Sequence, residues 1–411
     1  MTFCHGIKKL PASHNLIYDL KTHAFELKRY YELKVSSSII TADDYMQTLT
    51  DAITLRLRSD VEVGTCLSGG LDSSSVAALA SSLYQSKAQK AFSAITAISE
   101  QASNDESHFA KAVVNHCKLN WICTKPSYDD FQQKLKDIIY IQEEPFSSPS
   151  IVMQYYVMKA ARQSNIPVLL DGQGGDETLL GYGRYLASHA FDEYQKNGIK
   201  GFLQGLKSIR EQNSRLSILK TAQYFFGTHL PHLRYHIHRL EHRYLSKEHV
   251  QAPAHLYGYA KAAQNLFDLQ KLEIESTNLP ALLRFEDKNS MANSIETRLP
   301  FLDYRLVEHA LSLPFETKIH QGWTKYLLRK GIEQKLPQEI VWRKNKFGFE
   351  APEQIWLAKH QNIMLESIKK SSLLQSICQY EPMKKNLSMR TLWRLYTIAL
   401  WEEQFAIEEM R

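Results

Sequence analysis

One stretch decides the fold of this chain: Val61-Glu62-Val63-Gly64-Thr65-Cys66-Leu67-Ser68-Gly69-Gly70-Leu71-Asp72-Ser73-Ser74-Ser75. A β-rich run ends at Leu67, a glycine loop follows, and an alanine- and leucine-rich run over 76–83 predicts a helix. Such a unit gathers backbone N–H groups and the positive end of a helix at one point, and Gly69 and Gly70 let an anion approach. The stretch predicts a phosphate-binding loop, although a tight turn capped by serines has the same pattern.

A second glycine loop, over 171–177, also follows an apolar strand-like run, over 167–170. Both loops are therefore expected at the carboxyl ends of parallel strands, where α/β proteins bind ligands. Asp72 of the first loop and Asp176 of the second are expected to face the phosphates, and two such carboxylates predict a bridging Mg²⁺. The lysine-bearing Walker loop of ordinary γ-phosphoryl transfer does not occur in the sequence.

Strand and helix signals alternate up to residue 185. Strands are predicted at 91–98 and 166–170, and helices at 41–58, 105–114, 130–139 and 150–162. We therefore expect an α/β fold, with a parallel sheet covered by helices on both faces over 41–185 and an α-rich part over 186–411. Residues 1–40 hold two short extended pieces, at 16–18 and 30–33.

The composition limits the class of protein. The 411 residues carry a net charge of +6, with 44% hydrophobic and 23% charged residues, which is typical of a folded protein and too small a surplus for a dedicated nucleic-acid binder. No apolar run reaches the roughly 20 residues of a membrane span, and the first residues do not resemble a signal peptide, so a cytoplasmic location is expected. The five scattered cysteines predict reduced thiols.

The first loop resembles the pyrophosphatase-type ATP loop of asparagine synthetases and their amide-forming relatives. The likeness continues in the same order along most of the chain, through Asp105-Glu106, Glu143-Glu144-Pro145-Phe146, Gly172 to Glu177 with Gly181-Tyr182, Ser290-Met291-Ala292, Ser294 to Asp303, Lys325 with Leu327-Leu328-Arg329, Leu336-Pro337, Arg343, Lys346 and Gly348-Phe349. This resemblance implies the synthetase domain of that family, with a fold like that of the adenine nucleotide alpha hydrolases.

The resemblance also implies a reaction and a set of site residues. A substrate carboxylate attacks the α-phosphate of ATP, pyrophosphate leaves, and ammonia displaces AMP from the acyl-adenylate to form an amide. The residues assigned to ATP and pyrophosphate are Leu67, Ser68, Gly69, Gly70, Asp72, Ser73, Ser74, Ile98 and Gly172. Asp72 and Asp176 are assigned to Mg²⁺, and Lys325 joins them as a catalytic residue that reaches the phosphates. From spacing alone, Lys325 would be a solvated helix lysine, and Leu67 and Ile98 would be core residues.

Two positions depart from the family pattern. Gln173 stands where many members have an acid, and Asp171 stands where a serine is usual. Glutamine cannot take a proton from ammonium, so amination needs another base or neutral ammonia, and acceptors other than aspartate become plausible. The resemblance assigns Gln173, Glu296 and Arg298 to the substrate and ammonia side. Either Glu296 or Arg298 orients the carboxylate substrate, or the two form an ion pair at a helix end.

The nitrogen source is a further expectation from the resemblance. Residues 1–40 resemble the tail of the glutaminase domain that precedes the synthetase domain in this family, but its nucleophilic cysteine is missing and Cys4 is interpreted as an ordinary thiol. Ammonia is then expected from solution or from a separate glutaminase subunit, unless the chain is a truncated gene product. The other expected partner is a small-molecule or peptide carboxylate, without a membrane or nucleic acid.

Alternatives remain at this point. A tRNA-modifying user of the same loop is disfavoured because the chain has no paired cysteines and no basic domain. A non-catalytic scaffold descended from a ligase is supported by Gln173 and by the missing glutaminase. A histidine-rich stretch invites a metal interpretation, but a basic helical surface is the preferred one; its members are His229, His232, His236, His238, His242 and His249.

Overall fold

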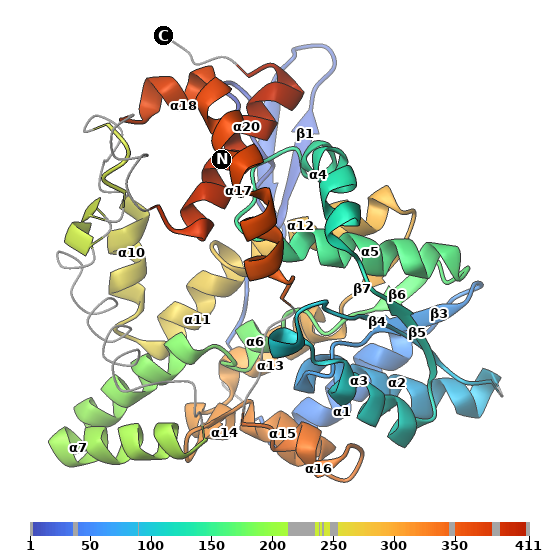
Figure 1. Ribbon diagram of the computed structural model, residues 1–411. Coiled ribbons are helices and arrows are strands. Elements are labelled where there is room, and N and C mark those ends of the chain that lie inside the picture. Colours follow the sequence, from blue (N-terminus) through green and yellow to red (C-terminus); the bar gives the residue numbers. More distant parts are fainter. Residues whose placement is uncertain are drawn as a thin grey trace.

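The computed structural model describes residues 3–35, 40–88, 90–212, 235–237, 239–240, 242–246, 254–344, 350–379 and 387–407. It contains a five-stranded parallel sheet, drawn on the right in Figure 1, with strands β3 (Val63–Cys66), β4 (Ser93–Ala97), β5 (Asn120–Thr124), β6 (Val168–Leu170) and β7 (Glu296–Arg298). The strand order is β5-β4-β3-β6-β7, and every neighbouring pair is parallel. The predicted α/β fold is therefore confirmed.

Helices cover both faces of this sheet. One face packs on α1 (Ala42–Arg56), α2 (Leu71–Ala88) and α3 (Ser107–Cys117), and the other packs on α5 (Ser150–Gln163), which is joined by α4 (Tyr128–Gln142) and α12 (Leu279–Ala292). The alternation of side chains along β6 separates the two cores, because Val168 and Leu170 lie in the first core and Leu169 lies in the second.

The described residues after 178 are mostly helical. They contain α7 (Gly183–Gln212), α10 (Ala254–Ala262), α11 (Leu266–Glu275), α13 (Tyr304–Ser312), α14 (Phe315–Lys318), α15 (Tyr326–Ile332), α16 (Gln338–Val341), α17 (Glu353–Lys370), α18 (Ser372–Ile377) and α20 (Met389–Phe405), with two short strands, β8 (Ile319–His320) and β9 (Trp323–Thr324). Strand β7 also comes from this part and extends the sheet beside β6. The α-rich part and the sheet therefore share one hydrogen-bonded element.

An antiparallel hairpin of β1 (His14–Tyr18) and β2 (Phe25–Arg29) precedes the sheet. Its first strand matches the extended piece expected at 16–18, whereas the second strand forms at 25–29 and not at 30–33. Strand β5 was not predicted. Residues 296–298 were expected at the end of a helix, but they form β7, because their backbone pairs with the edge of β6. The helix expected over 76–83 begins earlier, at Leu71.

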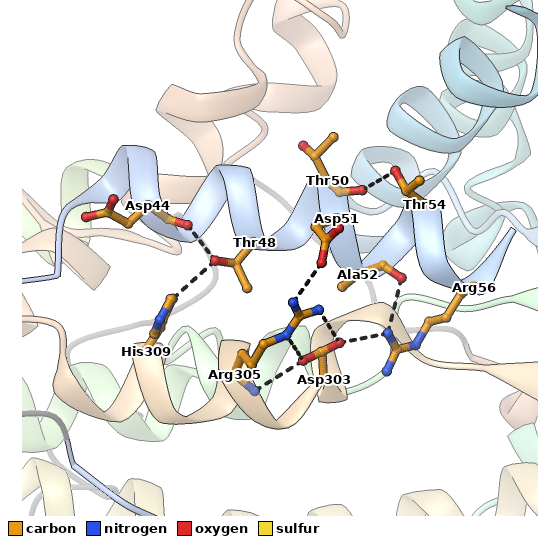
Figure 2. Close-up of polar contacts among 10 residues, drawn as sticks. All are labelled: Asp44, Thr48, Thr50, Asp51, Ala52, Thr54, Arg56, Asp303, Arg305 and His309. Atoms are coloured by element: carbon orange, nitrogen blue, oxygen red, sulfur yellow. Dashed lines mark hydrogen bonds and ion pairs between the residues drawn. The ribbon is translucent and has the colours of Figure 1, made fainter.

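An ion network joins α1 to the start of α13 (Figure 2). Asp303 accepts hydrogen bonds from Arg56 at 3.0 Å and from Arg305 at 2.9 and 3.0 Å, and Arg305 also pairs with Asp51 at 2.7 Å. Burial raises the pKa of Asp303, but the hydrogen bonds from Arg305 and Arg56 outweigh burial and lower it to about 2. The network fixes the α-rich part against the sheet domain.

Candidate functional site

Both glycine loops open at the point where the strand order reverses. Strand β3 has β4 on one side and β6 on the other, so the loops that follow β3 and β6 leave adjacent carboxyl ends in the middle of the sheet. This is the switch point at which open α/β sheets bind ligands. The topology thus brings the loop at 68–70 beside the loop at 171–174.

The first loop is held together by its serines. The Ser73 hydroxyl lies 3.0 Å from that of Ser68, it accepts from the Ser68 N–H at 3.2 Å, and the Gly70 N–H donates to the Ser68 hydroxyl at 3.3 Å. Helix α2 begins directly afterwards at Leu71, so its first N–H groups and its positive end are directed at the same loop. This arrangement suits an anion.

The second loop touches the first. A Cβ atom added to Gly172 would lie 2.7 Å from the Ser73 nitrogen and 2.9 Å from the carbonyl carbon of Asp72, which is closer than real Cβ contacts. Only glycine therefore allows this approach. The contact sets Asp72, on α2, facing the short helix α6 (Gly175–Thr178), which carries Asp176.

Lys325 connects the two aspartates. It is 3% exposed, its Nζ atom lies 2.6 Å from Oδ1 of Asp176, and the same atom pairs with Oδ2 of Asp72. Its backbone is left-handed, with φ of 55°, at the start of α15. Non-glycine residues in this region are strained and often functional. The structure thus brings together three of the residues expected in the site.

Gly181 leaves the space that this ion pair needs. An added Cβ would lie 2.0 Å from Oδ1 of Asp176 and 2.2 Å from Cε of Lys325. The position therefore has to be glycine if both side chains are to keep their places. The same dipeptide, Gly181-Tyr182, belongs to the sequence segments that resemble the synthetase family.

The donor set at this point fits Mg²⁺. Magnesium in nucleotide sites is usually held by one or two carboxylates and by substrate phosphates, and here the carboxylates of Asp72 and Asp176 converge on one cation, the Lys325 ammonium. Within the described residues, no group of three or more His, Cys, Asp or Glu side chains could hold a metal. A divalent cation here would depend on oxygens from a nucleotide.

A cavity of about 490 Å³ lies above the two loops. The expected site residues that line it are Leu67, Ser68, Gly70, Asp72, Ser73, Gly172, Gln173 and Asp176. Part of its wall was not expected from the sequence and comes from α5 and α12, including Gln154, Val157, Leu282 and Phe285. The described residues that line this cavity do not include Gly69, Ser74 or Ile98. Gly69 lies against α3, and its carbonyl accepts a hydrogen bond from Arg343 at 3.5 Å.

Glu296 and Arg298 lie on β7, and neither is among the described residues that line the cavity. Arg298 pairs with Glu296 at 2.7 Å and donates to the carbonyls of Arg56 and Arg58, at 2.7 Å each. Arg56 is the last residue of α1 and Arg58 lies just beyond it, and a cationic side chain stabilises such a helix end. The geometry therefore favours the ion-pair alternative for this pair over orientation of a substrate.

Two buried acids near the cavity were missed. Glu177 accepts from Tyr182 Oη and from the Asn278 amide, both at 2.6 Å, and burial and then the Asp176 charge raise its pKa. Glu286, on α12, is 1% exposed, and burial and then the charge of Asp171 raise its pKa well above the usual value. Nothing in the spacing of these residues indicates burial, because both follow or precede other charged residues.

Some expectations fall on residues that the structure does not describe. Lys346, Gly348 and Phe349 of the closing family segment, and His229, His232, His238 and His249 of the histidine-rich stretch, lie outside the described residues. Among the helices that are described, none has both the length and the apolar character to cross a membrane.

The parallel sheet and the cavity at its switch point define an α/β protein of the kind that binds ligands at the carboxyl ends of its strands. A family model described as asparagine synthase matches residues 44–403. The chain therefore belongs to the asparagine synthase family, as its sequence motifs indicate.

Two relatives of the chain are named as asparagine synthetases. The glutamine-hydrolysing asparagine synthetase 1 of Bacillus subtilis is 27% identical over 88% of this chain and 60% of its own length. Asparagine synthetase 2 of the same organism is 27% identical over 83% of this chain and 44% of its own length. The chain thus spans 60% or less of these relatives. A solved U34-tRNA thiolase from Methanococcus maripaludis covers 71% of this chain and 88% of its own, with 16% identity and a TM-score of 0.30.

Proposed function

We propose that this chain is the synthetase part of an ATP-dependent amide ligase. It adenylates a substrate carboxylate, with release of pyrophosphate, and then transfers the acyl group to ammonia. The observation that carries the proposal is that Asp72 and Asp176, which line a cleft beside a glycine loop, both pair with the buried Lys325. Membership of the asparagine synthase family supports a ligase that uses ATP.

The residues of the cleft fit the needs of the first step. Pyrophosphate leaves readily only when its developing charge is stabilised by fixed dipoles and cations. The N–H groups at the start of α2, the hydroxyls of Ser68 and Ser73 and the Lys325 ammonium are arranged to provide this stabilisation. Asp72 and Asp176 would hold Mg²⁺, which neutralises phosphate charge when it is bound.

The cavity offers room on both sides of the phosphates. Its apolar wall around Leu67, Ile95 and Ala97 is where we place the adenine, and the wall formed by Leu282 and Phe285 is where we place the carboxylate acceptor. Aspartate, a peptide, a sugar acid and a cell-wall precursor are the acceptor classes to test. We also retain the cytoplasmic location expected from the sequence, because that compartment supplies ATP.

The hairpin supports a glutaminase unit as the nitrogen source. All residues of β2 are exposed, and the hairpin carries apolar side chains in solvent, among them Leu16, Ile17, Phe25 and Leu27, which are 45–66% exposed. A two-stranded hairpin is only marginally stable alone, and an exposed strand edge is a pairing surface. We propose that a glutaminase domain or subunit covers it and delivers ammonia.

The proposal is tested by the products and by two variants. The purified chain is incubated with Mg-ATP, ammonium and a panel of carboxylates that begins with L-aspartate, and AMP and pyrophosphate are measured. We expect pyrophosphate release that depends on one acceptor, and its loss in Asp72→Asn and in Asp176→Asn. Asp129→Asn, in the exposed first turn of α4, is the matched control and keeps the wild-type rate.

Other outcomes would contradict the proposal. ADP as the sole nucleotide product would exclude adenylation. Full activity of either cleft variant would exclude the assigned role of its carboxylate, and silence with every acceptor would favour the non-catalytic scaffold. If the chain alone used glutamine as efficiently as ammonium, a separate glutaminase unit would be unnecessary.

A further inference from the structure

Two fully buried polar side chains, Lys318 and Gln270, are linked to the short helix α6. Both are 0% exposed, and Lys318 ends α14 whereas Gln270 belongs to α11. The Lys318 ammonium donates to the side-chain oxygen of Gln270 at 2.9 Å and to the carbonyl of Ala310, on α13, at 2.7 Å. Both acceptors are uncharged, and the removal of a cation from water is costly. The cost indicates that the contact with Gln270 does more than fill space.

The Gln270 amide caps the end of α6. Its Nε2 atom donates to the carbonyls of Glu177 and Thr178, at 3.1 and 2.5 Å. The last carbonyls of a helix need partners outside the helical hydrogen-bond pattern, and an NH2 group has one hydrogen for each of these two. Because α6 has only four residues, it makes few hydrogen bonds of its own, and the cap contributes a large share of its stability.

Lys318 determines which way this amide faces. A glutamine side chain can turn over and exchange the positions of its oxygen and its nitrogen. An ammonium group only donates, so Oε1 of Gln270 has to face Lys318, and Nε2 then faces α6. With an apolar side chain in place of Lys318, the amide would be free to turn its oxygen toward two carbonyl oxygens, and the cap would be lost.

The cap is connected to the cleft through Asp176. Helix α6 carries Asp176, which lines the cavity and pairs with Lys325 at 2.6 Å. Helices α11 and α13, which hold the buried contacts, both pack against α6 (Figure 1). A carboxylate that binds a metal depends on the groups that fix its position.

We propose that Lys318 is a positioning residue for Asp176. It orients the Gln270 amide, the amide caps α6, and the capped helix holds the Asp176 carboxylate at the cleft. The inference rests on the proposed function only in giving Asp176 its role at Mg²⁺. The cap itself is tested without ATP, acceptor or metal.

Hydrogen–deuterium exchange of the chain alone tests the cap. The amides to follow are those of Thr178, Leu179 and Gly181, which donate to the backbone carbonyls of residues 174–176. In Lys318→Met, which replaces the ammonium by an apolar group of similar length, we expect these amides to exchange about 10-fold faster, on the scale of two lost hydrogen bonds. Peptides from α1 should be unchanged, and so should all peptides of the control Lys207→Met, whose lysine is exposed on α7.

Gln270→Glu tests the cap from its other side. The new carboxylate still offers an oxygen to Lys318, but it has no hydrogen for the two carbonyls of α6. Exchange at α6 should therefore rise as in Lys318→Met, although the buried lysine keeps a partner. If Lys318→Met fails to fold, this variant decides the same question.

The magnesium dependence of pyrophosphate release tests the consequence for Asp176. The loss of a group that orients a metal ligand typically changes metal affinity or activity by roughly 10–100-fold. In Lys318→Met and in Gln270→Glu, the Mg²⁺ concentration for half-maximal release should rise at least about 10-fold, while the KM for the acceptor stays as in the wild type. A merely structural defect would lower the maximal rate and leave both values unchanged.

A double variant tests whether Lys318 acts through Gln270. Lys318→Met combined with Gln270→Met should raise the Mg²⁺ requirement no further than Gln270→Met alone, because the cap is already absent. Effects that multiply would contradict this connection.

The remaining outcomes separate this inference from the proposed function. Unchanged exchange at α6 in either Lys318→Met or Gln270→Glu would overturn the inference, as would faster exchange spread evenly over the chain. Faster exchange at α6 with an unchanged Mg²⁺ requirement would contradict the link to Asp176. If the wild type releases no pyrophosphate, or Asp176→Asn keeps the full rate, the proposed function fails, while the exchange result still decides the cap.

Discussion

Gly181→Ala is expected to move the side chains of Asp176 and Lys325 apart without removing either of them. An alanine Cβ would lie 2.0 Å from Oδ1 of Asp176, and real Cβ contacts are essentially never shorter than 3.0 Å, so the carboxylate has to retreat by about 1 Å. The same methyl group would lie 2.2 Å from Cε of Lys325. A displacement of this size costs about 100-fold in rate, or about 2.7 kcal/mol of transition-state stabilisation.

The assay is acceptor-dependent pyrophosphate release under saturating Mg-ATP, together with the thermal midpoint of each protein. Gly258→Ala is the matched control, because Gly258 lies in α10 with nothing within 4 Å of the added Cβ. It should keep the wild-type rate and gain up to about 1 kcal/mol of stability from helix propensity. A wild-type rate for Gly181→Ala would refute the role of the Asp176–Lys325 contact, and equal losses in both variants would point to a general effect of alanine.

Two further predictions concern stability. Asp303→Asn should lose about 2 kcal/mol of unfolding free energy at pH 7, since the folded pKa of Asp303 is about 2 against 3.8 for a free aspartate. In urea denaturation, the difference between wild type and variant should shrink as the pH falls from 4 toward 2. A difference that stays constant over this range would contradict the low pKa of Asp303. Lys318 is fully buried, and burial lowers its pKa to about 7, so the unfolded chain binds one more proton between pH 7 and 10.5. The unfolding free energy of the wild type should therefore rise relative to that of Lys318→Met between pH 7 and 10.5. Parallel pH profiles of the two proteins would contradict the lowered pKa of Lys318.

The local elements were predictable because their signals lie in adjacent residues. The helix predicted over 41–58 begins with a capping box that Thr41 and Asp44 form at the start of α1. The alternation of apolar runs and glycine loops likewise predicted the parallel sheet. Strand β7 was missed because a three-residue segment becomes a strand only through pairing with β6, which is distant in sequence.

The site could be predicted only in part, for the same reason. The sequence placed Asp72 and Asp176 on loops at the ends of strands, but spacing alone suggested a solvated position for Lys325, and only the family resemblance placed it at the phosphates. The burial of Glu286 depends on packing of α12 beside the cavity, and its neighbours Asp287 and Lys288 give it the pattern of an exposed helix face.

Transfer of oxygen from the acceptor to AMP tests the central claim most directly. The chain is incubated with Mg-ATP, ammonium and the active carboxylate labelled with ¹⁸O in both oxygens, and the AMP is examined by ³¹P NMR. If the carboxylate attacks the α-phosphate, each AMP molecule carries one ¹⁸O atom and the amide keeps the other. Unlabelled AMP, or ADP with phosphate in its place, would contradict the account.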